Sequence, residues 1–296
     1  MSIVICSCNR AESLRKTLEG LKEVVTPQGK TWEAVVVDNN SRDNTKDVVD
    51  AFARNNPGLA RYVFEKRQGK SFALNAGVGN AKGDIIAFTD DDCIVDRHWI
   101  SAILDEFASD PDLAVLGGRV ELYNKDDRPL SLVRWSEKTV FQSLDLLFEP
   151  LIIGCNMAAK KAVFHRAGQF DPALGPGSIG SAIAEDVDFI YRAHKKGFKV
   201  IYSPDVLVYH NHGRQSDEEI KSLMRKYGIG RGSFYCKYIL RCDVDVIKLA
   251  YEELKRATIM ILLGTLRRES TDRRRQALRA LLRGAVSRIT YHAGVR

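Results

Sequence analysis

Several features that define other protein classes are scarce in this chain of 296 residues. Its six cysteines are scattered from Cys6 to Cys242 with no Cys-x-x-Cys pair, which excludes a disulfide scaffold and a zinc-ribbon spacing. The apolar run Ile259–Leu263 is far shorter than the roughly 18 residues that a membrane-spanning helix needs. The N-terminus lacks the basic stretch and long apolar core of a signal peptide. These absences predict a cytoplasmic protein with reduced thiols.

Surplus basic charge is missing from most of the chain. Residues 1–251 carry 34 basic and 34 acidic side chains, whereas residues 252–296 carry 11 and 4, so the net charge of +7 lies entirely in the last segment. A nucleic-acid-binding domain instead carries a basic face or stripe. We therefore expect no nucleic-acid partner, and a neutral domain followed by a basic tail.

The first half of the chain alternates between short apolar runs and amphipathic segments. The runs predict strands at 2–6, 33–38, 61–64 and 84–89, and the segments between them predict helices at 12–21, 45–55 and 71–78. This alternation is typical of an α/β protein with a mostly parallel sheet flanked by helices. The second half predicts strands at 113–122, 151–154 and 199–202, a Gly/Pro-rich loop at 174–180 and a helix at 185–196.

Polar clusters follow three of these strands: Cys8-Asn9-Arg10, Asp38-Asn39-Asn40 and Asp90-Asp91-Asp92. Ligands in α/β sheets bind beyond the carboxyl ends of the strands. Three adjacent carboxylates repel one another, and a divalent cation that also contacts phosphates would relieve this repulsion. A solvated acidic turn is the alternative. The G-x-G-x-x-G run of a dinucleotide-binding fold is absent after the first strand.

Further motifs follow in a fixed order. They are Val37-Asp38-Asn39-Asn40-Ser41, Gly69-Lys70 with Asn75 and Gly77, Gly83-Asp84, Thr89-Asp90-Asp91-Asp92, Gly154-Cys155-Asn156-Met157, Gly168 with Phe170-Asp171, Glu185-Asp186-Val187-Asp188 and His210. Together with the strand ending in Cys8-Asn9-Arg10, they make residues 2–212 resemble a family 2 glycosyltransferase. The resemblance implies a GT-A fold, which is a Rossmann-like sheet flanked by helices.

The resemblance also implies roles for individual residues. Asp92 would be a ligand of Mn²⁺ or Mg²⁺ with Asp90, which also lies nearer the ribose, and His210 would complete the metal site. Asp186 would be the catalytic base. The implied nucleotide-sugar-binding residues are Cys8, Asn9, Arg10, Asp38, Asn40, Lys70, Asn75, Asp90 and Asp91, and the implied acceptor-side residues are Asn156 and Glu185.

Two of these assignments have alternatives in the sequence itself. Glu185 and Asp186 could be carboxylates that favour the first turn of a helix. His212 stands two residues after His210, so either histidine could face the metal.

The implied chemistry is a metal-dependent, inverting transfer of sugar from a nucleotide-sugar, expected to be a UDP-sugar, to an acceptor hydroxyl. A divalent cation neutralises the diphosphate leaving group, and one carboxylate activates the acceptor. We expect a saccharide or lipid-linked acceptor, in bacterial polysaccharide or glycolipid synthesis. A sugar-phosphate nucleotidyltransferase would place a Gly-rich basic loop after the first strand, where Cys8-Asn9-Arg10 stands. A non-catalytic nucleotide-sugar-binding module would not require an intact Asp186.

The charge and hydropathy patterns divide the chain. We expect a catalytic domain at 1–245, with a nucleotide-sugar-binding half at 1–115 and an acceptor-binding half at 116–245, and a basic amphipathic helical tail at 246–296. One apolar stripe of the tail comprises Ala277, Leu278, Leu281, Leu282, Ala285, Val286 and Ile289. Arg275, Arg279 and Arg283 lie beside it, so segment 252–296 would bind peripherally to an anionic membrane, at the inner face of the cell membrane. The alternative is a helix packed on the domain with its basic face in solvent.

Overall fold

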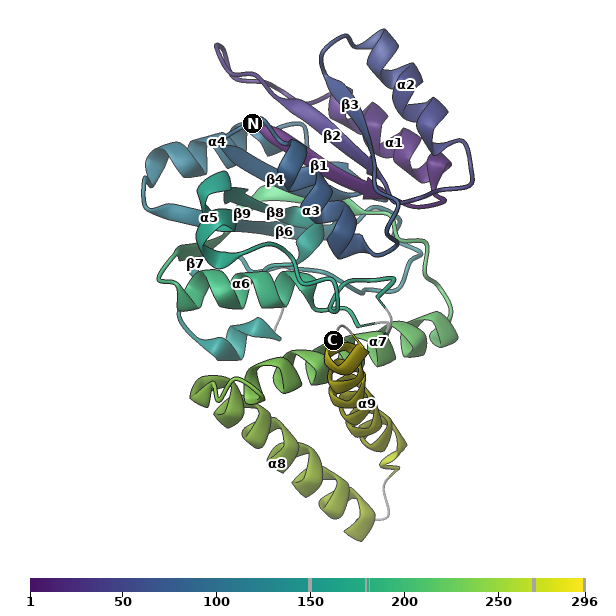
Figure 1. The fold of residues 1–296 in the computed structure, drawn as a ribbon, viewed down its shortest axis with the longest axis vertical. Coiled ribbons are helices and arrows are strands. Elements are labelled where there is room, and N and C mark those ends of the chain that lie inside the picture. The colour runs from purple at the N-terminus through teal and green to yellow at the C-terminus, as the bar shows by residue number, and fades with distance from the viewer. Residues whose placement is uncertain (149–150, 179, 181, 268–269, 295–296) are drawn as a thin grey trace. The chain divides into compact units, whose positions relative to one another are not determined.

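The computed structural model describes the whole chain except residues 149–150, 179, 181, 268–269 and 295–296. The chain divides into two compact units (Figure 1). The sheet unit comprises Met1–Phe170 and Phe189–Gln215, and the helical unit comprises Asp171–Asp188 and Ser216–Arg296.

A sheet with the strand order β3-β2-β1-β4-β8-β6-β9-β5 forms the centre of the sheet unit, and β7 pairs with β9. Its strands are β1 (Ser2–Ser7), β2 (Glu33–Asp38), β3 (Ala60–Phe64), β4 (Ile85–Asp90), β5 (Cys93–Val95), β6 (Leu113–Leu122), β7 (Thr139–Val140), β8 (Met157–Lys160) and β9 (Lys199–His210). The neighbours from β3 to β4 are parallel, as the alternating pattern predicts. β8 runs antiparallel to both β4 and β6, so the sheet is mixed beyond β4.

Helices flank this sheet (Figure 1). They are α1 (Ala11–Lys22), α2 (Thr45–Asn55), α3 (Lys70–Asn80), α4 (Trp99–Ser109), α5 (Lys161–Ala167) and α6 (Glu185–Lys195), with 3₁₀ turns η1 (Leu144–Leu147) and η2 (Gly154–Asn156). Each buries its apolar side, as Leu14 and Leu18 do in α1. On α3, Gly77 lies so close to Val4 and Val37 of the sheet that a side chain there would collide with Val4. The predicted α/β fold with a flanked central sheet is confirmed.

Two predicted strands differ from the structure. Residues 151–154 are not a strand, because Leu151–Ile153 is extended loop that leads into η2. Their apolar character has another cause, since the side chain of Ile152 is buried against Gly117. The strand predicted at 199–202 continues to His210, because its register against β6 shifts between Gly118 and Arg119. This irregularity accommodates Pro204, which lies just beyond the predicted end of the strand at residue 202.

The helical unit is built from three long helices, α7 (Asp217–Ile239), α8 (Val244–Leu266) and α9 (Asp272–Gly294). α7 begins with a capping box, in which Ser216 and Glu219 satisfy each other's backbone N–H groups. α9 packs closely on α7 at small residues. A side chain on Gly232 would collide with the Leu281 carbonyl, and one on Gly284 with the Ile229 carbonyl.

The predicted tail is thus part of a larger body. The helical unit takes in α7 from Ser216 onward, whereas the charge pattern places the boundary at residue 245. Charge marks the segment that carries excess arginine, but the glycines of α7 decide what α9 packs against. Within the described residues, no helix is both long enough and apolar enough to cross a membrane.

Candidate functional site

Strand register brings the predicted polar clusters of the sheet unit to one edge. Ser7 pairs with Asp38 across β1 and β2, and Cys6 pairs with Asp90 across β1 and β4. These strands are parallel, so their carboxyl ends and the loops that follow them are neighbours. The residues after β1, β2 and β4 therefore lie together at one edge of the sheet.

The carboxylates Asp90, Asp91 and Asp92, here called the strand-end cluster, are contacted by two cations. Arg10 bridges the cluster, with Nη1 3.1 Å from Asp91 Oδ1 and Nη2 2.9 Å from Asp92 Oδ2. Lys70 Nζ lies 2.6 Å from Asp90 Oδ1. Three carboxylates thus face two permanent cations, which leaves the balance of charge to the imidazole of His210.

Asp91 shows the effect of burial within this cluster. Burial raises its pKa to about 6, with further contributions from Asp92 and Asp90, although Arg10 and the Ser7 hydroxyl oppose the shift. Ser7 Oγ donates to Asp91 Oδ2 at 2.7 Å. A buried carboxylate among like charges favours a nearby cation.

His210 lies against the same cluster, because β5 and β9 pair Cys93 with His210. Its Nε2 is 3.3 Å from Asp92 Oδ1. Burial disfavours the charged imidazole, but the hydrogen bond to Asp92 and the nearby Cys155 and Asp92 raise the pKa of His210 to about 9. In turn, His210 and Arg10 lower the pKa of Asp92 well below its usual range, against the effect of burial.

Asp92, Cys93 and His210 could hold a metal ion, since one ligand atom from each lies within 4.8 Å of the others. Cys93 is the least fitting donor of the three, because thiolate sulfur suits softer metals than the divalent cations that carboxylate and imidazole ligands favour. His210 Nδ1 is buried, and within the described part of the chain it has no hydrogen-bond partner. A carboxylate and an imidazole remain as the fitting donors for a divalent cation.

The structure also separates the two histidines that the sequence could not. The imidazole of His212 lies with Nδ1 3.5 Å from Asp127 Oδ2, and this nitrogen accepts the N–H of Arg214 at 2.9 Å. His210 is therefore the histidine beside Asp92.

The loops after β1 and β2 are joined by their own polar groups. The side-chain oxygen of Asn9 accepts the N–H of Arg42 at 2.7 Å, and the backbone N–H of Asn9 donates to Ser41 Oγ at 2.9 Å. Asn9 and Asn40 have φ of 55° and 62°, the left-handed region that asparagine tolerates. Both residues thus shape the loops around Cys8 and Arg10.

Asp38 lies buried at the end of β2. Its Oδ2 accepts the Tyr62 hydroxyl at 2.7 Å and its Oδ1 accepts Ser41 N–H at 2.8 Å. Sequence patterns indicated no role for the neighbouring Asn39. Its Oδ1 accepts the N–H of Gly69 at 2.8 Å and so connects this loop to the start of α3.

Two other predicted site residues, Asn75 and Asn156, use their side-chain amides in hydrogen bonds within the sheet unit. Asn75 makes reciprocal hydrogen bonds of 2.8 Å with the backbone of Phe170. Asn156 is 1% exposed, accepts Trp99 Nε1–H and donates to the carbonyls of Arg119 and Val206, each at 2.8 Å. Both amides hold distant segments of the sheet unit together.

The helical unit contains the remaining predicted residues. Glu185 is buried and Asp186 is half-buried in the first turn of α6, where Asp186 Oδ1 accepts the N–H of Val187 at 2.8 Å. Two residues farther on, Asp188 is fully buried.

Asp188 belongs to a buried group of four charges, here called the helical-unit cluster, with Asp171, Lys237 and Arg288. Lys237 Nζ lies 2.5 Å from Asp188 Oδ1 and 2.8 Å from Asp171 Oδ2. Arg288 Nη1 lies 2.9 Å from Asp171 Oδ2. Two carboxylates thus face two cations, and the carboxylates stand at the two ends of segment 171–188, which carries Asp186.

Sequence patterns did not indicate that the two cations of this cluster are buried. Lys237 and Arg288 are 5% and 3% exposed, yet they stand in helices whose composition predicts solvated basic side chains. Asp171 and Asp188 lie within recognisable motifs, so only their acidic side could be found by sequence reasoning.

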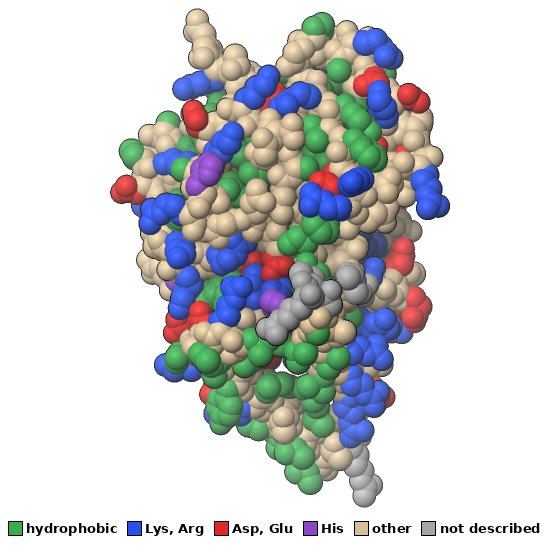
Figure 2. All heavy atoms as spheres, in the orientation of Figure 1, with side chains coloured by type: hydrophobic (Ala, Val, Ile, Leu, Met, Phe, Trp, Pro, Cys, Tyr) green, Lys and Arg blue, Asp and Glu red, His purple; other side chains and the backbone are tan. Residues whose placement is uncertain are grey.

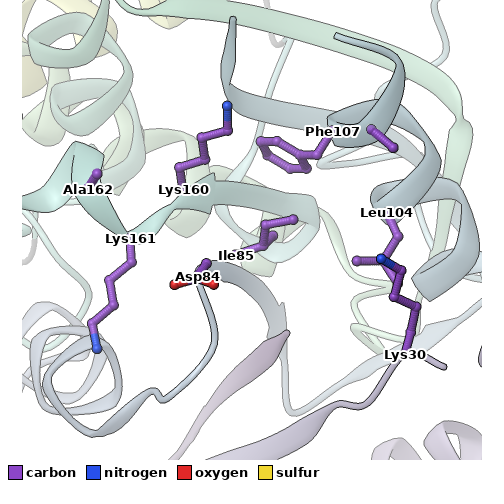
Figure 3. A pocket seen from close by; sticks show the side chains of 9 residues that line it. Lys30, Asp84, Ile85, Leu104, Phe107, Lys160, Lys161 and Ala162 are labelled. Carbon is purple, nitrogen blue, oxygen red and sulfur yellow. The ribbon is translucent and has the colours of Figure 1, made fainter. Parts of the chain in front are cut away.

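A pocket of about 400 Å³ lies elsewhere in the sheet unit (Figure 3). Its lining includes Asp84 and Ile85, at the amino end of β4, which is the end opposite the strand-end cluster. Lys160 and Lys161 also line it, and they donate to the carbonyls of Pro111 and Ala81. These lysines act within the fold, and the pocket is separate from the candidate site.

Comparison with known proteins agrees with this geometry. The model of the family described as glycosyl transferase family 2 matches residues 2–167. Glycosyltransferase AglE of Haloferax volcanii is 26% identical over 233 residues, covering 78% of this chain and 72% of that protein. Succinoglycan biosynthesis protein ExoM of Rhizobium meliloti is 25% identical over 209 residues, covering 71% of this chain and 66% of that protein.

Solved structures share the fold at lower identity. Mannosyltransferase PcManGT from Pyrobaculum calidifontis, in complex with GDP-Man and Mn²⁺, has a TM-score of 0.65 at 19% identity, covering 97% of this chain and 86% of that one. S. aureus TarS in complex with UDP-GlcNAc has a TM-score of 0.55 at 15% identity, covering 78% and 66%.

Proposed function

Because the chain belongs to glycosyl transferase family 2 and is a glycosyltransferase, we propose that it moves a sugar from a nucleotide-sugar to an acceptor hydroxyl with inversion, using a divalent cation at Asp92 and His210. The observation that carries this proposal is the pairing of Asp92 with His210 beside the other carboxylates of the strand-end cluster. The bound cation would neutralise charge on the departing nucleoside diphosphate.

The donor set favours Mn²⁺ over Mg²⁺. Mg²⁺ prefers oxygen ligands and retains several waters, whereas an imidazole ligand suits later transition metals better. Arg10 and Lys70 are the cations nearest the cluster, with N–O distances of 2.6–3.1 Å to its carboxylates. We assign them to the diphosphate of the donor, because both can exchange a carboxylate oxygen for a phosphate oxygen.

Asp186 is the proposed base. It is a half-buried carboxylate in the first turn of α6, and the same turn is fixed through Asp188, which accepts Lys237 Nζ and the Tyr238 hydroxyl. A base must hold a defined position to take the acceptor proton during attack. One base and no protein nucleophile give direct displacement, which inverts the anomeric carbon.

We assign a UDP-sugar as donor and a saccharide or lipid-linked acceptor. Asp38, buried at the strand edge, is the carboxylate placed to bind the base or ribose. The relative ExoM is named for succinoglycan biosynthesis, which supports a role in polysaccharide assembly. Since one structural neighbour binds GDP-Man and another UDP-GlcNAc, the base requires a direct test.

Donor binding gives that test without knowledge of the acceptor. The full chain is titrated by calorimetry with UDP- and GDP-sugars in Mn²⁺, in Mg²⁺ and in EDTA. We expect a UDP-sugar to bind in Mn²⁺, less tightly in Mg²⁺, and weakly in EDTA. Equal affinity in EDTA would contradict the metal site, and binding of GDP-sugars alone would contradict the uridine assignment. The sugar that binds is then supplied with candidate acceptors, and release of nucleoside diphosphate is measured.

A further inference from the structure

The second half of α8 exposes an apolar surface, here called the apolar tip, at residues 257–266. This stretch carries no charged side chain, and only Gly264 in it is buried. Its large side chains are exposed by 45% at Ile259, 44% at Met260, 59% at Leu262, 41% at Leu263 and 79% at Leu266. A soluble surface rarely gathers so many large apolar side chains without a partner.

Basic side chains border the apolar tip on both sides. Lys255 and Arg256 precede it, and Arg267 follows it. The first turn of α9 adds Arg273 and Arg274, and Arg274 Nη1 donates to the Met260 carbonyl at 3.0 Å. The start of α9 therefore lies against the tip. Figure 2 shows hydrophobic side chains gathered where Figure 1 places α8 and α9, with Lys and Arg side chains alongside.

The apolar stripe predicted on α9 is only partly buried in the structure. Leu281 is buried in the packing against α7, while Leu282, Val286 and Ile289 are 57%, 63% and 54% exposed. Because α9 uses one side for α7, α8 carries the larger continuous apolar surface.

We propose that the apolar tip inserts into the interface of an anionic lipid bilayer. A ten-residue helix is about 15 Å long and cannot cross a hydrocarbon core of about 30 Å. It is suited to lie at the boundary of head groups and acyl chains, with bordering arginines on the lipid phosphates. A second copy of the chain fits this surface less well, because it would bring the bordering basic side chains of both copies together.

Vesicle binding of the full chain tests this proposal. Leu262→Ser with Leu266→Ser is compared with Leu240→Ser, a control at the residue that caps the end of α7 and is also 59% exposed. With vesicles of phosphatidylcholine and phosphatidylglycerol, we expect the double variant to lower the partition coefficient by at least about tenfold, and the control to leave it unchanged. Binding should weaken with salt and with vesicles of phosphatidylcholine alone.

Insertion has its own readout. Leu262→Trp fluorescence should be quenched by lipids brominated on the acyl chain, and Leu240→Trp fluorescence should not, each relative to the wild type. Equal vesicle binding by wild type and double variant would overturn the proposal. So would a wild type that dimerises, by light scattering, and a double variant that is monomeric with vesicle binding retained, since a second copy would then occupy the surface.

Discussion

The two charge clusters balance their carboxylates in different ways. In the helical-unit cluster, Asp171 and Asp188 face Lys237 and Arg288, so charge is matched by permanent cations. In the strand-end cluster, three carboxylates face two permanent cations, and the third positive charge is the protonated imidazole of His210. The clusters also differ in the pKa values of their carboxyl groups. Although burial raises the pKa of Asp171, Lys237 and Arg288 bring it to about 2, whereas burial and like charges raise the pKa of Asp91 to about 6.

The balance of charge distinguishes a binding site from a buried ion-pair network that stabilises the fold. A matched buried cluster has no remaining demand for a cation, so removing a member exposes an uncompensated charge and costs stability. A cluster whose third positive charge is a proton on an imidazole can exchange that proton for a ligand cation, so removing a member costs binding. A variant of the helical-unit cluster should therefore act mainly on the free energy of unfolding, and a variant of the strand-end cluster on the affinity for a cation.

The largest effect is expected within one turn of α6. Asp186→Asn cannot accept a proton, so turnover should fall by about 10²–10⁴ while donor affinity stays unchanged. Asp188→Asn is the matched control, and it should instead lower the free energy of unfolding because Lys237 loses one partner. Nucleoside diphosphate release and urea denaturation measure the two quantities. Full turnover by Asp186→Asn would make Asp186 a helix-start carboxylate only.

Lys237→Met should lower the free energy of unfolding by about 3–5 kcal/mol, because it leaves two buried carboxylates to Arg288 and Tyr238. Lys237→Arg keeps the charge and should lose less. Urea denaturation followed by circular dichroism measures both variants. If Lys237→Met were as stable as wild type, the helical-unit cluster would not contribute to the stability of the fold.

Asp92→Ala should weaken Mn²⁺ binding by more than about a hundredfold, because even indirect supports of a metal ligand are worth 10–100-fold. Its free energy of unfolding should also fall, because Arg10 and His210 lose an ion-pair partner. Calorimetry with Mn²⁺ measures the affinity. Asp110→Ala, which removes a surface carboxylate paired with Lys199, serves as the control. Unchanged Mn²⁺ affinity in Asp92→Ala would move the metal site elsewhere.

The smallest effect concerns pH. The folded pKa of Asp171, about 2, lies below the unfolded value of about 3.9, so its stabilisation is present above pH 4 and is lost as pH falls through 2. The loss should amount to about 2 kcal/mol. Asp171→Asn should be less stable at neutral pH, and the difference from wild type should shrink over this range. A difference that stays constant from pH 5 to pH 2 would contradict the ion pairs.

Sequence patterns predicted most of the fold and which polar residues gather at the strand ends. Strand ends and their polar residues are local features, so parallel register alone brings Ser7, Asp38 and Asp90 together. The family resemblance placed His210 beside Asp92, but only the structure separates His210 from His212.

Contacts between distant helices could not be predicted in this way. The α9 pattern indicates one apolar stripe, but the glycines of α7, including Gly232, admit α9 so closely that Leu281 and Arg288 become buried. A truncation near residue 250 would remove both side chains. We therefore expect such a chain to lose stability, whereas the charge pattern alone predicts a self-sufficient domain ending before the tail.

The cluster that Lys237 closes also has a kinetic consequence. Its partners Asp171 and Arg288 stand far apart in the sequence, and contacts of high sequence separation form late because a long loop must first be closed. The strands β1 and β2, by contrast, pair over a separation of only 31 residues. During refolding, the β1–β2 pairing should therefore form before the ion pair of Asp171 with Arg288 closes.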